Sequence, residues 1–418
     1  MKILWMKPIL PYPPTQGTRR VTLQLLQNLA PSHRIRLFTR LLSSGERREA
    51  SRLAEAVPGL EVQARLAPNR VSALHRAFYR FRVRNELARG VPPVEAYTAL
   101  PSLVRDFEEV ARSFSPDLVV VEYWYSFPYL RAAGRRPCVL LAHDVEHRAR
   151  ARVPEGRSGF HVEASRDRAW APVERERERA ALGGAPFVWF LTEADLGLAV
   201  EDAGVDPARA AVVPYGLDLG GSLAPRREGD PDESPESVLL FGSYAADFNR
   251  DALAFTLDAV WPEIRERRPE ARLLVAGGGL PSGLAGKARA LGAEVRGEVA
   301  DVRRLLLGSS VVLVPLRYGG GLRIRLLESL ALGRAVVGTP TGVLGMGPRD
   351  GVEVLAAETP ADLARHVVRA LADSELRLRL GAAGRRWVET HHDPEAAGRA
   401  HRDLVLRSRT VQQPGDAG

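Results

Sequence analysis

Short apolar runs alternate with longer segments of helical period along most of this 418-residue chain. Apolar runs followed by amphipathic segments are typical of strands in parallel sheets that helices bury on both faces. We therefore predict an α/β protein built from doubly wound parallel sheets. The predicted strands lie at residues 2–5, 34–38, 60–64, 117–122, 138–142, 187–191, 211–213, 238–241, 272–276, 294–296, 311–315 and 335–337.

The length of the chain exceeds what one ordinary core holds, so two domains are expected. The stretch 225–237 is charged, rich in proline and without apolar period, and we predict that it links a first domain of residues 1–224 to a second of residues 238–393. Both domains should be Rossmann-like. We expect them to face each other across a cleft, because open sheets bind ligands beyond the carboxyl ends of their strands. A helix at about residues 394–410 could pack back on the first domain.

The chain carries a net charge of +8, and only three of its 59 basic residues are lysine. A GC-rich genome explains such a bias, although a positive surface would also attract anionic substrates, acidic lipids or nucleic acid. No zinc-finger spacing, aromatic RNA-binding motif or basic tail occurs in the sequence, so a nucleic-acid partner is not predicted.

The single cysteine, Cys138, excludes an intrachain disulfide and lies in an apolar run, where a buried strand position is expected. We find no apolar stretch long enough for a signal peptide or a membrane span. These features predict a cytoplasmic protein.

One run joins an apolar strand at residues 311–315 to three consecutive glycines, to a helical segment and to another strand. Gly319, Gly320 and Gly321 allow positive φ angles and a close approach to a ligand, and the following helix directs its N-terminal N–H groups at an anion. Arg325 and Glu328 are three residues apart and share one helix face, where they would offer a cation for phosphate and an acceptor for sugar hydroxyls. The alternative is a tight strand-to-helix turn without a ligand.

Four strings follow one another in the second half: LLFGSYAADFNRDAL, LLVAGGG, VRGEVADV and VPLRYGGGLRIRLLESLALGRAVVGTPTGVLGM. In this order they resemble the retaining nucleotide-sugar glycosyltransferases of the GT-B fold, family 4, and especially the sugar transferases of exopolysaccharide clusters. Arg325 occupies the lysine position of that pattern, and Glu328 occupies the glutamate that is expected to bind the ribose. Many members place another glutamate where this chain has Gly320, a replacement that the exopolysaccharide subgroup shares.

The resemblance implies further contacts with the donor nucleotide. Arg250 is a candidate for the diphosphate, although a solvated helix-surface arginine is an equal alternative, and the neighbouring Asn249 could cap a helix. Asp301 is expected to cap the helix that follows it. The remaining predicted donor-binding residues lie in loops after strands: Gly17, Gly242, Val299, Gly320, Gly321 and Leu322.

His143 and Asp144 follow a predicted strand directly, where active-site groups of an open sheet gather. The family often has a histidine or an acidic residue near this place that reaches the donor sugar or the acceptor, so both residues are predicted to be catalytic. One alternative is a capping Asp144 beside a surface histidine. A metal pair of His143 and His147 lacks a third ligand. Glu122 and Tyr123 also follow a strand and are candidates for the acceptor site.

We therefore expect a retaining glycosyltransferase that needs no metal or other cofactor and uses a nucleoside-diphosphate sugar. The acceptor could be a glycan, a lipid-linked molecule or a small molecule. A nucleotide-sugar epimerase of the same fold and a non-catalytic nucleotide-sugar binder are the alternatives. The segment 71–90 mixes aromatic residues with arginine, which indicates either peripheral contact with an acidic membrane or an ordinary helix packed on the first sheet.

Overall fold

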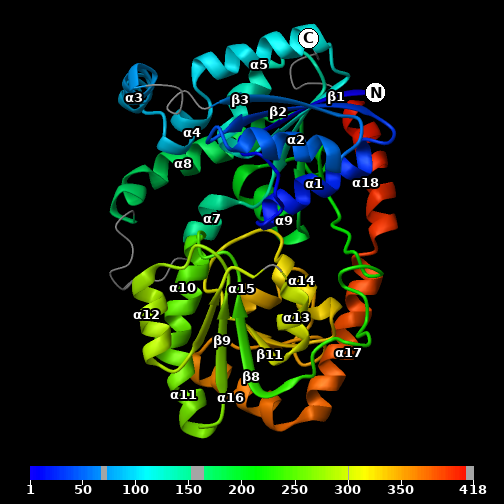
Figure 1. Cartoon of the computed structure of the whole chain (residues 1–418). Helices are drawn as coiled ribbons and strands as arrows, with labels where there is room; N and C mark the ends of the chain where they lie inside the picture. The colour runs from blue at the N-terminus through cyan, green and yellow to red at the C-terminus, as the bar shows by residue number, and fades with distance from the viewer. Residues whose placement is uncertain (67–72, 152–163, 300, 411–418) are drawn as a thin grey trace. The chain divides into compact units, whose positions relative to one another are not determined.

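The computed structural model describes residues 1–66, 73–151, 164–299 and 301–410. Of these residues, one compact unit holds 1–151, 164–214 and 398–410, and a second holds 215–397. We call them unit 1 and unit 2. Each contains a parallel sheet with helices packed against it (Figure 1).

Unit 1 contains a seven-stranded sheet in the order β3-β2-β1-β4-β5-β6-β7, and every pairing is parallel. The central strands are buried along their whole length, because helices cover both faces of the sheet. The strands are β1 (Lys2–Lys7), β2 (Arg34–Leu41), β3 (Leu60–Leu66), β4 (Leu118–Glu122), β5 (Cys138–Ala142), β6 (Phe187–Phe190) and β7 (Ala210–Val212).

The helices of unit 1 follow the strands in the order expected of a doubly wound fold. Phe107 packs edge to face on Phe38 and on Tyr129, which fixes one helix layer to the sheet. The helices are α1 (Gly17–Leu29), α2 (Glu46–Ala56), α3 (Ala73–Ala88), α4 (Pro93–Thr98), α5 (Pro101–Phe114), α6 (Phe127–Ala132), α7 (Glu146–Ala151), α8 (Ala164–Gly184) and α9 (Glu193–Ala203).

Unit 2 contains a six-stranded parallel sheet in the order β10-β9-β8-β11-β12-β13. Apolar side chains form two clusters in unit 2, one on each face of the sheet. The strands are β8 (Ser234–Phe241), β9 (Arg272–Ala276), β10 (Glu294–Gly297), β11 (Ser309–Val314), β12 (Ala335–Gly338) and β13 (Leu355–Ala356).

The helices of unit 2 include one π-helical turn, Thr256–Val260, between two α-helices. The others are α10 (Asp247–Phe255), α11 (Trp261–Arg267), α12 (Ser282–Ala290), α13 (Val302–Leu307), α14 (Ile324–Ala331), α15 (Pro340–Val343), α16 (Pro360–Ala372) and α17 (Ser374–His391).

The last helix, α18 (Pro394–Arg409), starts in unit 2 and continues into unit 1. There His401 bonds to Asn28 of α1 at 3.0 Å and to the Pro214 carbonyl at 2.7 Å, and Trp189 donates to Ser408 at 3.0 Å. Figure 1 shows this helix in red beside α1. The contacts are those expected of a helix that packs back on the first sheet.

The predicted fold is confirmed: two Rossmann-like parallel sheets, with a strand at each predicted position. The two-residue strand β13 was not predicted, because so short a run carries no readable period. Cys138 is buried in β5, as expected. Among the described residues, no helix combines the length and apolarity that crossing a membrane requires.

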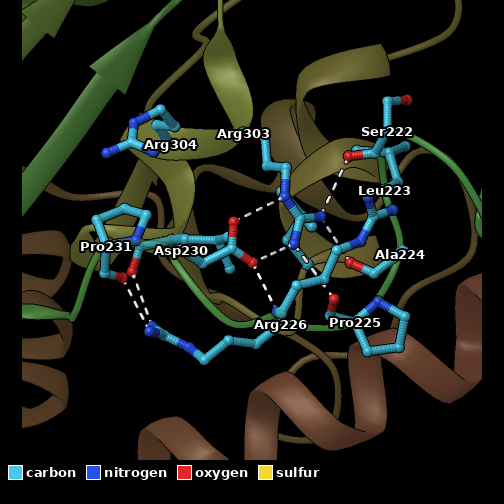
Figure 2. A network of polar contacts seen from close by, with 12 residues as sticks. Ser222, Leu223, Ala224, Pro225, Arg226, Asp230, Pro231, Arg303 and Arg304 are labelled. Carbon is cyan, nitrogen blue, oxygen red and sulfur yellow. Dashed lines mark hydrogen bonds and ion pairs between the residues drawn. The ribbon is translucent and has the colours of Figure 1, made fainter.

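The prediction that residues 225–237 form a linker between two domains is wrong, because the whole stretch belongs to unit 2. The division between the units falls after Pro214, and β8 already begins at Ser234. The preceding loop is held to α13 by Arg303, which bonds to Asp230 and to the Ala224 carbonyl at 2.7 Å (Figure 2). These contacts join residues more than seventy positions apart, so the local composition could not reveal them.

Candidate functional site

In unit 2, the loops that follow four neighbouring strands gather at the carboxyl edge of the sheet. The N–H of Gly242, after β8, donates to the Ala276 carbonyl at 3.1 Å, and the N–H of Gly277, after β9, donates to the Gly297 carbonyl at 2.5 Å. A Cβ atom at Gly277 would lie 1.8 Å from the Gly242 carbonyl oxygen, so only glycine permits this approach. The backbone is therefore packed tightly where ligands of such sheets bind.

Arg325 lies in the first turn of α14, and its guanidinium reaches the loop after β8. Its Nη2 donates to the Asn249 side-chain oxygen at 2.5 Å, and the Asn249 amide nitrogen donates to the Ser243 carbonyl at 2.6 Å. Burial lowers the pKa of Arg325 to about 10, so the group remains charged at neutral pH. A half-buried cation whose hydrogen-bond acceptor is a neutral amide is suited to an anionic ligand.

The loop between β11 and α14 takes the positive φ angles that its glycines allow, 116° at Gly319 and 73° at Gly321. Arg323, which is buried, donates to the Gly320 carbonyl and so braces the loop. The N-cap residue of α14, Arg323, makes no side-chain capping hydrogen bond. The N-terminal backbone groups of α14 and Arg325 thus form one positive region, as expected for a phosphate site.

The other residues predicted to bind the donor take several positions around this loop. Glu328 lies one turn after Arg325 on α14, half-buried, and its charge favours the ionised form of that arginine. Leu322 packs on the apolar core of unit 2, and so does Val299. Gly320 is half-buried within the loop itself.

Arg250 is held by its own loop. Its guanidinium donates to the Tyr244 and Ala245 carbonyls at 2.9 Å each and pairs with Asp247 at 2.9 Å. These contacts fix the turn before α10 and leave the diphosphate role of Arg250 a prediction.

The two predicted helix caps have different outcomes. The prediction for Asn249 is wrong, because α10 begins at Asp247 and the Asn249 side chain instead holds Arg325. The prediction for Asp301 is confirmed: its carboxylate accepts a hydrogen bond from the Arg304 N–H at the start of α13.

In unit 1, α1 begins at Gly17, as expected, and Gly17 itself is exposed. His143 directly follows β5 and is only 4% exposed. Its Nε2 lies 2.7 Å from Oε2 of Glu122, at the end of β4, and Lys7 at the end of β1 lies 2.5 Å from the same oxygen. The alternative of a surface histidine is therefore wrong.

The Glu122 carboxylate is ionised although it is fully buried. Burial alone would favour the neutral acid, but the charge of Lys7 and the hydrogen bond from His143 lower the pKa of Glu122 to about 2. Trp5 donates to its other oxygen at 2.6 Å, and the Thr22 hydroxyl lies within 3.0 Å of both oxygens. Glu122 is thus the centre of a buried polar cluster rather than an exposed part of an acceptor site.

Asp144 is half-buried and lines a small pocket beside His143, which is too narrow for a water molecule. The alternative role of Asp144 as a helix cap is not seen at the start of α7. There the Glu178 carboxylate accepts hydrogen bonds from the N–H groups of Glu146 and His147, at 2.8 Å each.

His147 belongs to a different cluster from His143. Its Nδ1 lies 2.7 Å from Glu178, and its Nε2 contacts Asp202. Burial opposes protonation, but the two carboxylates raise the pKa of His147. Within the described ranges we find no group of three or more histidine, cysteine or acidic residues placed to hold a metal.

The sequence reasoning missed Lys7, Thr22 and Arg323. A lysine in an otherwise apolar first strand was the available signal for Lys7, since β1 pairs with β4 and a buried lysine requires an acidic partner. Arg323 had no such signal, because its partners are backbone carbonyls of the glycine loop.

Comparison with known proteins relates both halves of the chain to glycosyltransferase families. Residues 16–216 match the family described as glycosyl transferase 4-like domain, and residues 235–373 match the family described as glycosyl transferases group 1. Together with the two parallel sheets, these matches show the fold of GT-B glycosyltransferases.

Particular proteins resemble the chain to different extents. Phosphatidyl-myo-inositol mannosyltransferase of Mycobacterium tuberculosis is 32% identical over 193 residues, which cover 44% of this chain and 50% of that protein. The same protein of Mycobacterium bovis gives the same values. The chain is thus matched over about half the length of these curated relatives.

Solved structures share the fold at low identity. Sucrose-phosphate synthase from Thermosynechococcus elongatus superposes with a TM-score of 0.74 at 18% identity, over 97% of this chain and 98% of that one. HepE from Anabaena, in complex with UDP and glucose, gives a TM-score of 0.67 at 15% identity, over 97% and 99%. At such identities the likeness shows the fold alone.

Proposed function

We propose that the protein transfers a sugar from a nucleoside-diphosphate sugar to a hydroxyl of a glycan, a lipid-linked molecule or a small molecule. The observation that carries the proposal is the half-buried Arg325 beside Gly242, at the carboxyl edge of the unit 2 sheet. The mannosyltransferase name of the relatives and the UDP and glucose bound by HepE support a nucleotide-sugar donor.

The proposed chemistry follows from where charge develops. Breaking the anomeric C–O bond leaves positive charge on the sugar and negative charge on the departing diphosphate, which Arg325 and the N-terminus of α14 would stabilise. Glu328 would accept hydrogen bonds from the ribose. We propose that the anomeric configuration is retained, that the leaving phosphate assists deprotonation of the acceptor, and that no metal is required.

His143 and Asp144 are the proposed catalytic residues at the transferred sugar or the acceptor. Both lie at the carboxyl edge of the unit 1 sheet, and both line the same pocket. This position is the one that active-site groups of open sheets occupy.

We also propose a cytoplasmic protein that touches acidic membranes through α3. Val71 and Ser72, the first residues of the segment predicted for this role, lie outside the described residues. Within α3, Phe81 is 60% exposed, whereas Val83 is buried. One side of this helix thus packs on unit 1, and an aromatic ring on the other side is available to a lipid surface.

A thermal-shift panel tests donor binding. Nucleoside diphosphates and their sugars are added to the wild type, to Arg325→Ala and to Glu328→Ala, with Arg289→Ala and Glu358→Ala as controls at exposed positions of unit 2. We expect one nucleotide family to stabilise the wild type and both controls, and to stabilise the two site variants much less. Equal stabilisation of Arg325→Ala would contradict the proposed site.

A further inference from the structure

We propose that Lys7 and Glu122 are positioning residues that hold His143 as a neutral imidazole, with Nδ1 ready to accept a hydrogen bond from a substrate hydroxyl. This inference rests on the proposed function only for the identity of the hydroxyl-bearing ligand, a sugar. The arrangement of the three side chains is observed within unit 1 alone.

The tautomer of His143 follows from its partner. Glu122 is ionised and can only accept hydrogen bonds, and its oxygens already receive Lys7, Trp5 and Thr22. The Nε2 atom of His143, 2.7 Å from Oε2, must therefore carry the proton. In a neutral ring Nδ1 is then left with its lone pair.

The charge of the cluster keeps the ring neutral. Lys7 is 1% exposed and Glu122 is 0% exposed, and the two form an ion pair whose net charge is zero. A protonated His143 would add an uncompensated buried charge. Burial lowers the pKa of His143, the hydrogen bond to Glu122 opposes this, and the charge of Lys7 lowers it further.

Nδ1 is a buried atom for which the described residues supply no hydrogen-bond partner. Buried polar atoms are nearly always paired, so an unpaired one at the carboxyl edge of a parallel sheet points to a ligand atom. The Tyr123 ring stacks on the imidazole with centroids 4.5 Å apart and fixes its plane. Tyr123 itself has a φ of 71°, a strained conformation for a tyrosine, typical of functional sites.

Other ionisable groups lie around this imidazole and bear on its titration. The Tyr123 ring also stacks on Tyr125. Three carboxylates come from the loop before α7, from α7 and from α8. The carboxylates that line the pocket with His143 are Asp144, Glu146 and Glu178. Their charges are unchanged in the variants below, so a difference between variants reports on Lys7 and Glu122.

The pH profile of sugar transfer distinguishes positioning from plain structural support. In Lys7→Met the Glu122 charge is uncompensated, so the pKa of His143 rises. Activity should then fall on the acidic side, with the acidic limb displaced upward by about one pH unit or more, while activity on the alkaline side is largely kept. The double variant Lys7→Met/Glu122→Gln removes the charge again and should return the limb toward the wild type.

Thr22→Val is the matched control, because it removes a hydrogen bond to Glu122 without changing any charge. We expect no displacement of its acidic limb. If Lys7→Met lowers activity equally at every pH, or if Thr22→Val displaces the limb as much, Lys7 acts only as structural support and the inference is overturned.

Nitrogen-15 NMR of histidine-labelled protein tests the same inference without any turnover, with His143 assigned by its loss in His143→Gln. At neutral pH the wild type should show a neutral ring with the proton on Nε2, and Lys7→Met should show a ring that protonates at higher pH. A proton on Nδ1, or a charged ring in the wild type, would overturn the inference.

The hydrogen bond from a substrate hydroxyl to Nδ1 is tested by adding nucleotide sugars and glycans to the labelled protein. A hydroxyl donated to Nδ1 should shift its resonance while the Nε2 resonance stays nearly unchanged. If a nucleotide sugar stabilises the protein through Arg325 and yet neither it nor any glycan moves Nδ1, the hydroxyl contact is refuted. Loss of the Arg325-dependent stabilisation itself would instead refute the proposed function.

Discussion

The guanidinium of Arg325 fills the space in which a side chain at Gly242 would stand: a Cβ atom there would lie 2.7 Å from Nη2. Gly242 has a φ of 155°, a conformation that side chains rarely adopt. The glycine after β8 thus allows the cation of α14 to lie against the backbone of the neighbouring loop.

Gly242→Ala should therefore displace Arg325 and weaken nucleotide binding by about tenfold or more, measured by calorimetric titration. The control is Gly286→Ala in α12, where a Cβ would meet nothing within 4 Å. Replacing that helical glycine should leave binding unchanged and stabilise the protein by up to about 1 kcal/mol. Equal binding by both variants would show that Arg325 needs no such space.

Asn249 orients the Arg325 guanidinium through a neutral oxygen. Asn249→Asp should lower nucleotide affinity more than Asn249→Ala, because a carboxylate at 249 would neutralise Arg325 and repel phosphate. We expect a loss of a few-fold for alanine and of more than tenfold for aspartate, with the difference shrinking at high salt. Tighter binding by the aspartate variant would contradict a phosphate role for Arg325.

The buried Lys7–Glu122 pair should make the stability of unit 1 depend on acid. The pKa of Glu122 is lowered from 4.5 to about 2 in the folded state, so its contribution to stability is fully present above about pH 4.5 and is lost as the pH falls toward 2. Urea unfolding between these pH values should be less steeply pH-dependent in Lys7→Met/Glu122→Gln than in the wild type.

The single variant Glu122→Gln should lower the free energy of unfolding by about 3–5 kcal/mol, because it leaves Lys7 charged and unpaired in the core. The double variant should lower it less. The same urea titration at neutral pH measures the difference. If the double variant is no more stable than the single one, the two side chains do not act as a pair.

The membrane proposal for α3 is tested by sedimentation with vesicles. Anionic vesicles should pull down the wild type, and Phe81→Glu should reduce this because it adds a negative charge at an exposed apolar position. Leu378→Glu, at a 71% exposed leucine of α17, makes the same change away from α3 and is the control. Equal binding to neutral and anionic vesicles would refute the proposal.

Activity should persist after chelation of divalent metals, since Arg325 and the start of α14 are proposed to supply the positive charge at the diphosphate. Transfer measured with a chelator, and again after Mg²⁺ or Mn²⁺ is restored, checks this. A requirement for added metal would contradict the proposed mechanism.

Most of the fold could be predicted because strands such as β4 and β5 are buried on both faces and therefore read as apolar runs. The glycine loop, Arg325 and Glu328 could be predicted as a group because they are close in sequence. The Lys7–Glu122–His143 cluster could not, since Lys7 and Glu122 are 115 positions apart and are brought together only by the pairing of β1 with β4. The role of Asn249 could not be predicted for the same reason, since its partner Arg325 lies 76 positions away.

The most direct test of the account is acceptor-dependent release of nucleoside diphosphate, measured with the donor that the thermal-shift panel selects. We predict release by the wild type and by Arg289→Ala, and a loss of about a hundredfold or more in Arg325→Ala with its folded structure retained. Turnover by Arg325→Ala at the wild-type rate would contradict the central claim that this arginine stabilises the departing diphosphate.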